Sequence, residues 1–160
     1  MTFEVHPDHC HVSGIYTFRN DSPEAVQKML YLPFPDTEKL PFPDFISITT
    51  GTNTPIAYRK SLNGIHFPVE IQPKSTVDIL ITYRQTTPEK CFEYILDTTM
   101  KWHFPLTSAE FIIFVPPGIQ IEQLSLRNPE ISQNSSGTRY RIYRENFRTD
   151  KNLSLRWRLK

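Results

Sequence analysis

The residues best suited to chemistry lie near the start of the chain, in the run HPDHCH at residues 6–11. On an extended strand His9 and His11 point to the same side, which allows two imidazoles to bind one metal ion. A zinc site needs a third or fourth ligand, and nothing in the sequence brings His66 or His103 near this run. We therefore predict no metal and no cofactor, and keep a small metal-binding protein that uses the three N-terminal histidines as an alternative.

The two cysteines, Cys10 and Cys91, lie 81 positions apart. If they were bonded, the disulfide would stabilise the fold by about 4–5 kcal/mol in the chain-entropy model. Two separately buried thiols fit the sequence as well, because pairing depends on a Cα separation that no sequence shows. As a nucleophile Cys91 lies in no recognisable Cys-His context, and Phe92 and Tyr94 beside it indicate ordinary strand packing.

The sequence lacks the signatures of common enzymes. It contains no G-x-S-x-G, no H-E-x-x-H and no glycine-rich phosphate loop, and its five glycines are isolated. We therefore predict that the chain is not an enzyme and has no catalytic residues.

Positive charge is concentrated at the C-terminal end. The net charge is +1, but residues 139–160 carry eight basic and two acidic side chains, a net of +6 that leaves −5 for the rest. Alternation places Arg139 and Arg141 on one strand face, and Arg156 and Arg158 on another. If these strands pair, opposed like charges cost about 1 kcal/mol or less per pair. The acidic side chains available to offset this charge are Glu110, Glu122 and Glu130.

A partner of the arginines would be a protein, a neighbouring domain or a lipid headgroup. A nucleic-acid-binding domain normally combines a stronger basic bias with stacking aromatic residues, and most of this chain is acidic. We therefore exclude nucleic acid from the expected partners. The alternative is a solvated strand face with acidic neighbours.

A short motif, LPFPD, occurs at residues 32–36 and again at residues 40–44. Its prolines cannot donate to a ladder, so the segment is expected to be extended and to cross between sheets or protect an edge. Projecting Phe34 and Phe42 could dock into a partner, or both could tuck into the edge of the fold. The predicted partner-binding residues are Phe34, Phe42, Arg139, Arg141, Arg156 and Arg158.

The elements that would position these residues are strands. Residues 65–71 and 77–83 alternate apolar and polar side chains around the turn at 72–75, which predicts a β-hairpin. The residues expected to face the core at the end of the chain are Tyr140, Ile142, Leu153, Leu155, Trp157 and Leu159. The other predicted strands are 3–5, 9–19, 25–32 (a central strand covered on both faces), 45–50, 55–60, 91–98, 111–115, 119–126, 138–143 and 152–159.

This spacing, with fourteen prolines, predicts an all-β fold: a single antiparallel β-sandwich, immunoglobulin-like or related, of about eight to ten strands over residues 1–160. The chain ends within a strand-like run, so we expect it to be part of a longer protein. It shows neither a signal peptide nor an apolar run of roughly 18–20 residues. We expect an extracytoplasmic or membrane-tethered protein whose tether lies outside this chain.

Part of the chain resembles a known family. The residues concerned are Val12-x-Gly14-x-Tyr16-x-Phe18-x-Asn20-x-Ser22, Leu30-Tyr31-Leu32-Pro33, Ile65-x-Phe67…Val69-x-Ile71 and Val77-x-Ile79-x-Ile81-x-Tyr83. Over residues 10–85 this pattern resembles the N-terminal β-sandwich domain of M1-type aminopeptidases and related accessory domains. The H-E-x-x-H of that family is absent, so the resemblance implies a scaffold beside another domain and no peptidase activity.

These observations predict a non-catalytic binding or assembly module that holds its partner through loops or through the arginine-bearing strands. The alternative from another class is an accessory domain of an enzyme whose catalytic domain is absent from this chain.

Overall fold

The computed structural model describes residues 1–101 and 104–160, and within them the fold is all-β, as predicted. The strands are β1 (Thr2–Val5), β2 (His9–Asn20), β3 (Val26–Pro33), β4 (Phe45–Thr50), β5 (Arg59–Ser61), β6 (Gly64–Ile71), β7 (Ser75–Thr86), β8 (Cys91–Tyr94), β9 (Leu106–Val115), β10 (Ile119–Leu124), β11 (Glu130–Asn134), β12 (Gly137–Phe147) and β13 (Leu153–Leu159). A 3₁₀ helix, η1 (Asp97–Lys101), follows β8. None of the helical segments among the described residues is long and apolar enough to cross a membrane.

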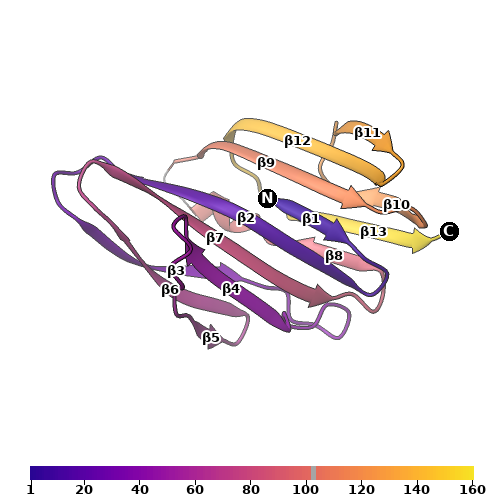
Figure 1. Ribbon diagram of the computed structural model, residues 1–160, viewed down its shortest axis with the longest axis horizontal. Helices are drawn as coiled ribbons and strands as arrows, with labels where there is room; N and C mark the ends of the chain where they lie inside the picture. Colours follow the sequence, from indigo (N-terminus) through magenta and orange to yellow (C-terminus); the bar gives the residue numbers. More distant parts are fainter. Residues whose placement is uncertain (102–103) are drawn as a thin grey trace.

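The strands form three sheets, in the orders β11-β12-β9-β1-β2-β7-β4, β10-β13-β8 and β3-β6-β5. In Figure 1 the seven-stranded sheet lies in front and the two smaller sheets lie behind it. The pair β1–β9 is parallel, so the large sheet is mixed. The described residues thus contain more strands than the eight to ten expected, and the single antiparallel sandwich is not confirmed.

The predicted hairpin over residues 64–85 is wrong in its pairing, although both of its strands exist. β6 pairs with β3 and β5, whereas β7 pairs with β2 and β4 in the large sheet. The alternating residues do face the core, as Ile65 and Ile79 show with 0% and 1% exposure. Alternation identifies which side chains share a face, but it does not identify the neighbouring strand.

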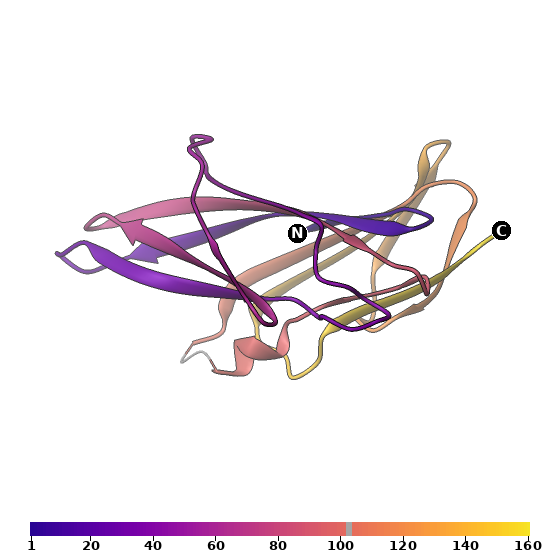
Figure 2. The same ribbon diagram turned by 90° about the horizontal axis from the view of Figure 1, so that it is seen from below.

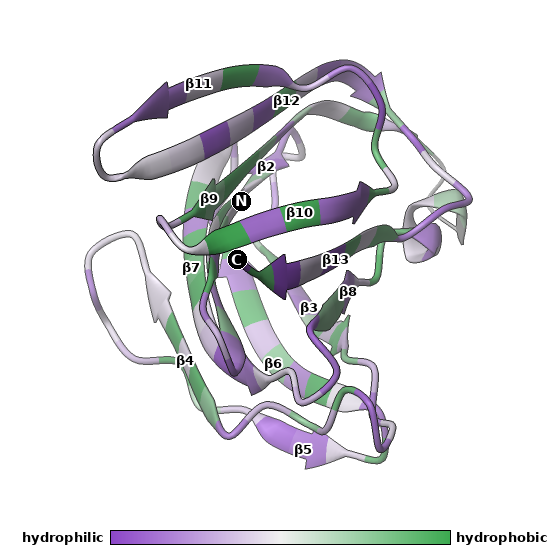
Figure 3. Cartoon of the chain, turned by 90° about the vertical axis from the view of Figure 1, so that its right-hand side faces the viewer, coloured by the Kyte–Doolittle hydropathy of each residue, from purple (hydrophilic) through white to green (hydrophobic). Residues whose placement is uncertain are grey.

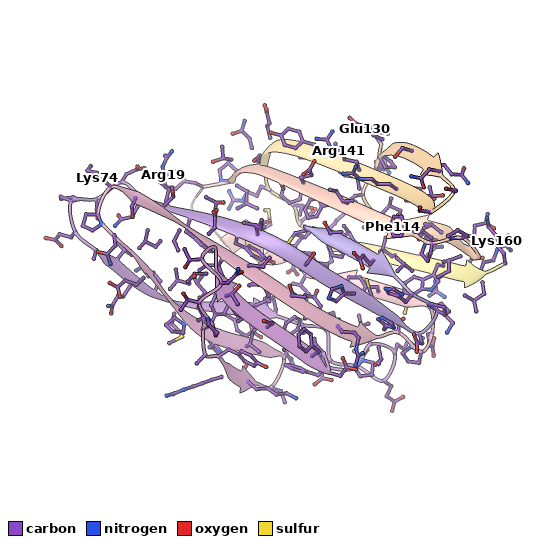
Figure 4. The ribbon with its side chains drawn as sticks, viewed as in Figure 1. Arg19, Lys74, Phe114, Glu130, Arg141 and Lys160 are labelled. Carbon is purple, nitrogen blue, oxygen red and sulfur yellow. The ribbon has the colours of Figure 1, made fainter. Side chains whose placement is uncertain are left out.

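A buried asparagine fixes the corner where the chain changes sheets. The connections β2–β3 and β6–β7 lie side by side at the left of Figure 1, where Figure 4 labels Arg19 and Lys74. Asn20 is 5% exposed, and its Oδ1 accepts from the Ser22 N–H at 2.9 Å. Its Nδ2 donates to the carbonyl oxygens of Glu24, Ile71 and Gln72 at 2.8, 3.1 and 3.1 Å. These bonds satisfy backbone groups that leave the ladders at the corner.

Strand β3 is an edge strand and not the central strand predicted for residues 25–32. Its apolar composition caused the error, because Met29 and Tyr31 point outward and are 63% and 46% exposed. Only one face of the strand packs inward, with Leu32 at 8% exposure.

Aromatic side chains join the layers. The Phe3 ring on β1 lies 5.9 Å from the Phe92 ring and 5.4 Å from the Tyr94 ring, both on β8. Figure 3 shows the alternation of hydrophobic and hydrophilic residues along β10 and β13. On β13 Leu153, Leu155 and Trp157 are buried as predicted, but Leu159 is 51% exposed because it lies at the protruding end of the strand in Figure 1.

The two cysteines are free thiols, so the disulfide alternative is wrong. Cys10 on β2 is completely buried, and burial raises the pKa of its thiol. Cys91 on β8 is partly exposed. A thiol reagent that samples the native protein therefore has access to Cys91 and not to Cys10.

Candidate functional site

The proline-rich connection formed by residues 34–44 runs from β3 in a small sheet to β4 at the edge of the large sheet (Figure 2), so the predicted crossing between sheets is confirmed. One buried side chain fixes it. Gln85 on β7 is 0% exposed, and its Nε2 donates to the carbonyl oxygens of Pro35 at 3.0 Å and Pro41 at 2.7 Å. One amide thus binds both copies of the repeated motif, where prolines supply no N–H.

The prediction that Phe34 projects toward a partner is wrong. Phe34 is 2% exposed and packs edge-to-face against Tyr83, with ring centroids 4.9 Å apart. Phe42 is half-buried against the core, 5.3 Å from the Phe34 ring, and the Lys60 Nζ lies 3.8 Å from its centroid. The apolar area that these rings bury stabilises the fold, which leaves Phe34 unavailable to a partner.

The outer side of this connection borders an open groove of about 630 Å³. Its wall is formed by Pro35, Thr37, Lys39 and Leu40. Its floor is the outer face of the β10-β13-β8 sheet, in two cross-strand rows, Cys91–Arg156–Gln123 and Glu93–Ser154–Ser125. The intervening side chains of Phe92 and Leu155 point into the core and are 1% and 2% exposed. The volume falls within the range of ligand sites, roughly 300–1,000 Å³.

Arg156 lies at the centre of this floor. Its side chain is exposed, and within the part of the chain that the structure describes, no hydrogen bond or ion pair involves its guanidinium. Glu93 in the next row accepts a hydrogen bond from the Asn152 Nδ2 at 2.7 Å. On the wall, the Lys39 Nζ lies 3.5 Å from a carboxylate oxygen of Glu89. The charged side chains of the groove are thus Arg156, Lys39 and Glu93. Of these three, Arg156 alone has no hydrogen-bond or ion-pair partner among the described residues.

The four predicted arginines do not form one cluster. β12 belongs to the large sheet and β13 to a small one, so the expected juxtaposition of Arg139 and Arg141 with Arg156 and Arg158 is wrong. Sequence reasoning missed this because strand pairing depends on contacts between distant parts of the chain. Arg139 is exposed on a second hollow of about 200 Å³, which Arg141 also borders.

The predicted acidic neighbours are confirmed. Arg141 donates to Glu110 at 2.6 Å and to Glu130 at 2.9 Å, and these two hydrogen bonds raise the pKa of its guanidinium. Figure 4 shows Arg141 and Glu130 near one another on the large sheet. Arg158 lies 3.6 Å from Glu122 and donates to the Gln120 Oε1 at 2.9 Å. Both arginines are therefore neutralised locally, in contrast to Arg156.

The N-terminal histidines are engaged in other contacts. His6 stacks on His9 with ring centroids 4.2 Å apart, and the His9 Nδ1 lies 2.7 Å from Asp8. The His11 Nδ1 lies 3.7 Å from Glu4. Over residues 1–101 and 104–160 no group of three or more His, Cys, Asp or Glu side chains is placed to hold a metal, so the histidine alternative has no site there. His103, considered above as a ligand, lies outside the described residues.

Sequence reasoning missed several residues of the site. Gln85 carried a signal, because it continues the inward-facing positions of Val77, Ile79, Ile81 and Tyr83 on β7 and is the polar member of that series. The floor residues Gln123 and Ser125 carried none, since their places beside Arg156 and Ser154 depend on how the β10 segment pairs with β13.

No protein-family model and no curated protein matches the chain. Among solved structures it is similar to a "putative nutrient binding protein" from Legionella pneumophila subsp. pneumophila str. Philadelphia 1, with a TM-score of 0.71 and 14% sequence identity. The match covers 98% of this chain and 64% of the Legionella protein, so the chain spans less than two thirds of its length. At this identity the similarity shows a shared fold.

Proposed function

We propose that the chain is a non-catalytic binding or assembly module and that the groove beside the proline-rich connection is its binding site. The observation that carries this proposal is Arg156, which lies in the floor of the groove without a partner among the described residues. Of the other three predicted arginines, Arg141 and Arg158 have carboxylate partners, and Arg139 borders the smaller hollow of about 200 Å³. A guanidinium that the fold leaves unpaired in a walled groove is available to an anionic group of a ligand.

Two further observations support the proposal. The groove wall is held by the Gln85 side chain, so the site is largely formed before a ligand binds. The similar Legionella protein is described as nutrient-binding, which agrees with a binding role. No histidine accompanies Cys91 among the described residues that line the groove, which favours binding over nucleophilic catalysis.

The proposal extends to the setting of the module. The two small sheets would serve as one layer of a sandwich against the large sheet, within an extracytoplasmic or membrane-tethered protein. The second candidate, an accessory domain of an enzyme, is favoured by one observation: the same fold occupies only 64% of the Legionella protein, so it also occurs within a longer chain. The likeness to M1-type aminopeptidase domains remains a prediction.

The experiment uses Cys91 as a reporter of the groove. Cys91 lines the groove and Cys10 is completely buried, so N-ethylmaleimide should alkylate only Cys91 in the native protein. The alkylation rate is measured by mass spectrometry with a panel of amino acids, tetrapeptides, sugars, inorganic phosphate and nucleotides. We expect one class to slow the reaction in the wild type and in Arg158→Gln, but not in Arg156→Gln. Rates unchanged by every class would contradict the proposed function.

A further inference from the structure

The chemistry of the groove indicates which class of ligand it takes, an inference that rests on the proposed function. Strand β8 forms one side of the groove floor and is an edge strand, which among the described strands pairs with β13 alone. The Trp157 N–H donates to the Lys90 carbonyl at 3.0 Å, so Lys90 points toward β13. Because backbone groups alternate in direction along an antiparallel strand, Phe92 also points toward β13, and Cys91 and Glu93 point away.

The outward edge of β8 has no backbone partner among the described residues. Within residues 1–101 and 104–160, no strand, bridge or loop hydrogen bond on this side uses the N–H or C=O groups of Cys91 and Glu93. The proline-rich wall does not supply a backbone partner for this edge. Its prolines lack N–H groups, and the carbonyls of Pro35 and Pro41 already accept hydrogen bonds from Gln85. An unpaired edge of this kind is a template for an added strand.

The charges in the groove narrow the choice of ligand. Arg156 is one strand away from this edge, in the same cross-strand row as Cys91. A guanidinium binds a carboxylate through two parallel hydrogen bonds, a geometry that an uncharged ligand does not satisfy. An extended peptide has both features, a backbone that pairs with an edge strand and a terminal carboxylate.

We propose that the groove binds a short peptide in extended conformation, which pairs with the free edge of β8 and places its terminal carboxylate at Arg156. Lys39, which lies beside Glu89, forms part of the wall on the other side of the groove. The wall also offers the apolar surfaces of Pro35 and Leu40 to a peptide side chain.

The probes are tetra-alanine with free termini, tetra-alanine C-terminal amide, and succinate as a carboxylate without a peptide backbone. Binding is followed by the slowing of Cys91 alkylation and by ¹H–¹⁵N signals of Cys91 and Glu93. Tetra-alanine should bind, and its amide should bind roughly tenfold more weakly or worse, since a charge-assisted hydrogen bond is lost. In Arg156→Gln this difference between acid and amide should disappear. In Arg158→Gln, on the same face of β13 but outside the groove, it should persist.

A second pair of variants tests the backbone edge. Glu93→Pro and Glu93→Gln both remove the carboxylate, but only proline also removes the outward N–H, at an edge position where proline is tolerated. We expect Glu93→Gln to retain tetra-alanine binding and Glu93→Pro to lose it, with circular dichroism confirming that both variants are folded. Equal binding by these two variants would overturn the proposed pairing.

The remaining outcomes separate this inference from the proposed function. If succinate protected Cys91 as well as tetra-alanine does, the proposal of a peptide ligand would be wrong, and the groove would be a site for small carboxylates. If a sugar or phosphate from the panel protected Cys91 and tetra-alanine did not, the proposal of a peptide ligand would also be wrong, whereas the proposed binding module would be supported. Absence of protection by every probe would refute both.

Discussion

Two arginines on strands predicted in the same way, Arg141 on β12 and Arg156 on β13, have opposite surroundings in the folded protein. On β12, Arg141 lies between two carboxylates, those of Glu110 and Glu130. On β13, Arg156 lies in the floor of a groove with no partner among the described residues. An arginine becomes a candidate binding residue where the fold places it in a groove and positions no carboxylate beside it. The number of positive charges in a segment does not reveal this.

The energetic scale of these interactions explains how both arrangements can exist. An exposed ion pair stabilises a protein by only about 0.2–1 kcal/mol, so leaving Arg156 unpaired costs the fold little. The opposite face of the same strand is where stability resides, because Leu155 and Trp157 are each 2% exposed. Substitutions on the two faces of β13, and at the two arginines, should therefore have different effects on stability.

The largest effect is expected on the inner face of the groove floor. Leu155→Ala leaves a cavity under Arg156 and should lower the free energy of unfolding by about 2–5 kcal/mol, measured by urea denaturation. Ser154→Ala, on the outer face, removes an exposed hydroxyl that makes no hydrogen bond within the described residues, and should change stability by less than about 0.5 kcal/mol. Similar losses for the two variants would refute the division between faces.

The next largest effect is expected from removing Gln85, whose side chain holds the proline-rich wall of the groove. Gln85→Leu removes the buried donor that binds the partly buried carbonyls of Pro35 and Pro41, and should cost about 1–3 kcal/mol of unfolding free energy. The looser wall should also speed alkylation of Cys91 by N-ethylmaleimide. Thr86→Ala, an exposed change on the same strand, serves as the control. A destabilised variant with an unchanged Cys91 rate would show that Gln85 has no role in shaping the groove.

A smaller effect distinguishes the two arginines. Arg141→Gln should lower stability slightly, since exposed ion pairs contribute little, and this loss should shrink at high salt. Arg156→Gln should leave stability within about 0.5 kcal/mol of the wild type at any salt concentration. Urea denaturation at low and high ionic strength measures both. A salt-dependent loss in Arg156→Gln would mean that Arg156 has an intramolecular partner in solution.

The smallest effect is a pH dependence at the end of the proline-rich connection. The hydrogen bonds from Arg84 hold the pKa of Asp44 below its usual range, with distances of 3.0 and 2.9 Å. Because the pKa is lower in the folded state, this contribution is complete above the unfolded pKa of about 3.9 and is lost as the pH falls through the folded value. The stability difference between wild type and Asp44→Asn should therefore shrink on acidification. A difference independent of pH would exclude the ion pair.

Much of the secondary structure was predictable because it depends on local patterns. β4 has the predicted bounds 45–50, and the alternation of β6 and β7 identified the side chains that face the core. β11 was missed because all five of its residues are exposed and show no period. Arg156 and the proline-rich connection were among the predicted site regions, but their proximity was not predictable.

The sequence alone determined the strand-rich character of the protein, the faces of its strands and the extended form of its LPFPD repeats, because alternation and the missing N–H of proline act on neighbouring residues. Three features are visible only in the folded protein: β6 and β7 join different sheets, β12 and β13 lie in different sheets, and Arg156 faces a groove whose wall is more than a hundred residues away in sequence. Strand pairing and register depend on contacts that are distant in sequence, and the partner of a charged side chain depends on them in turn.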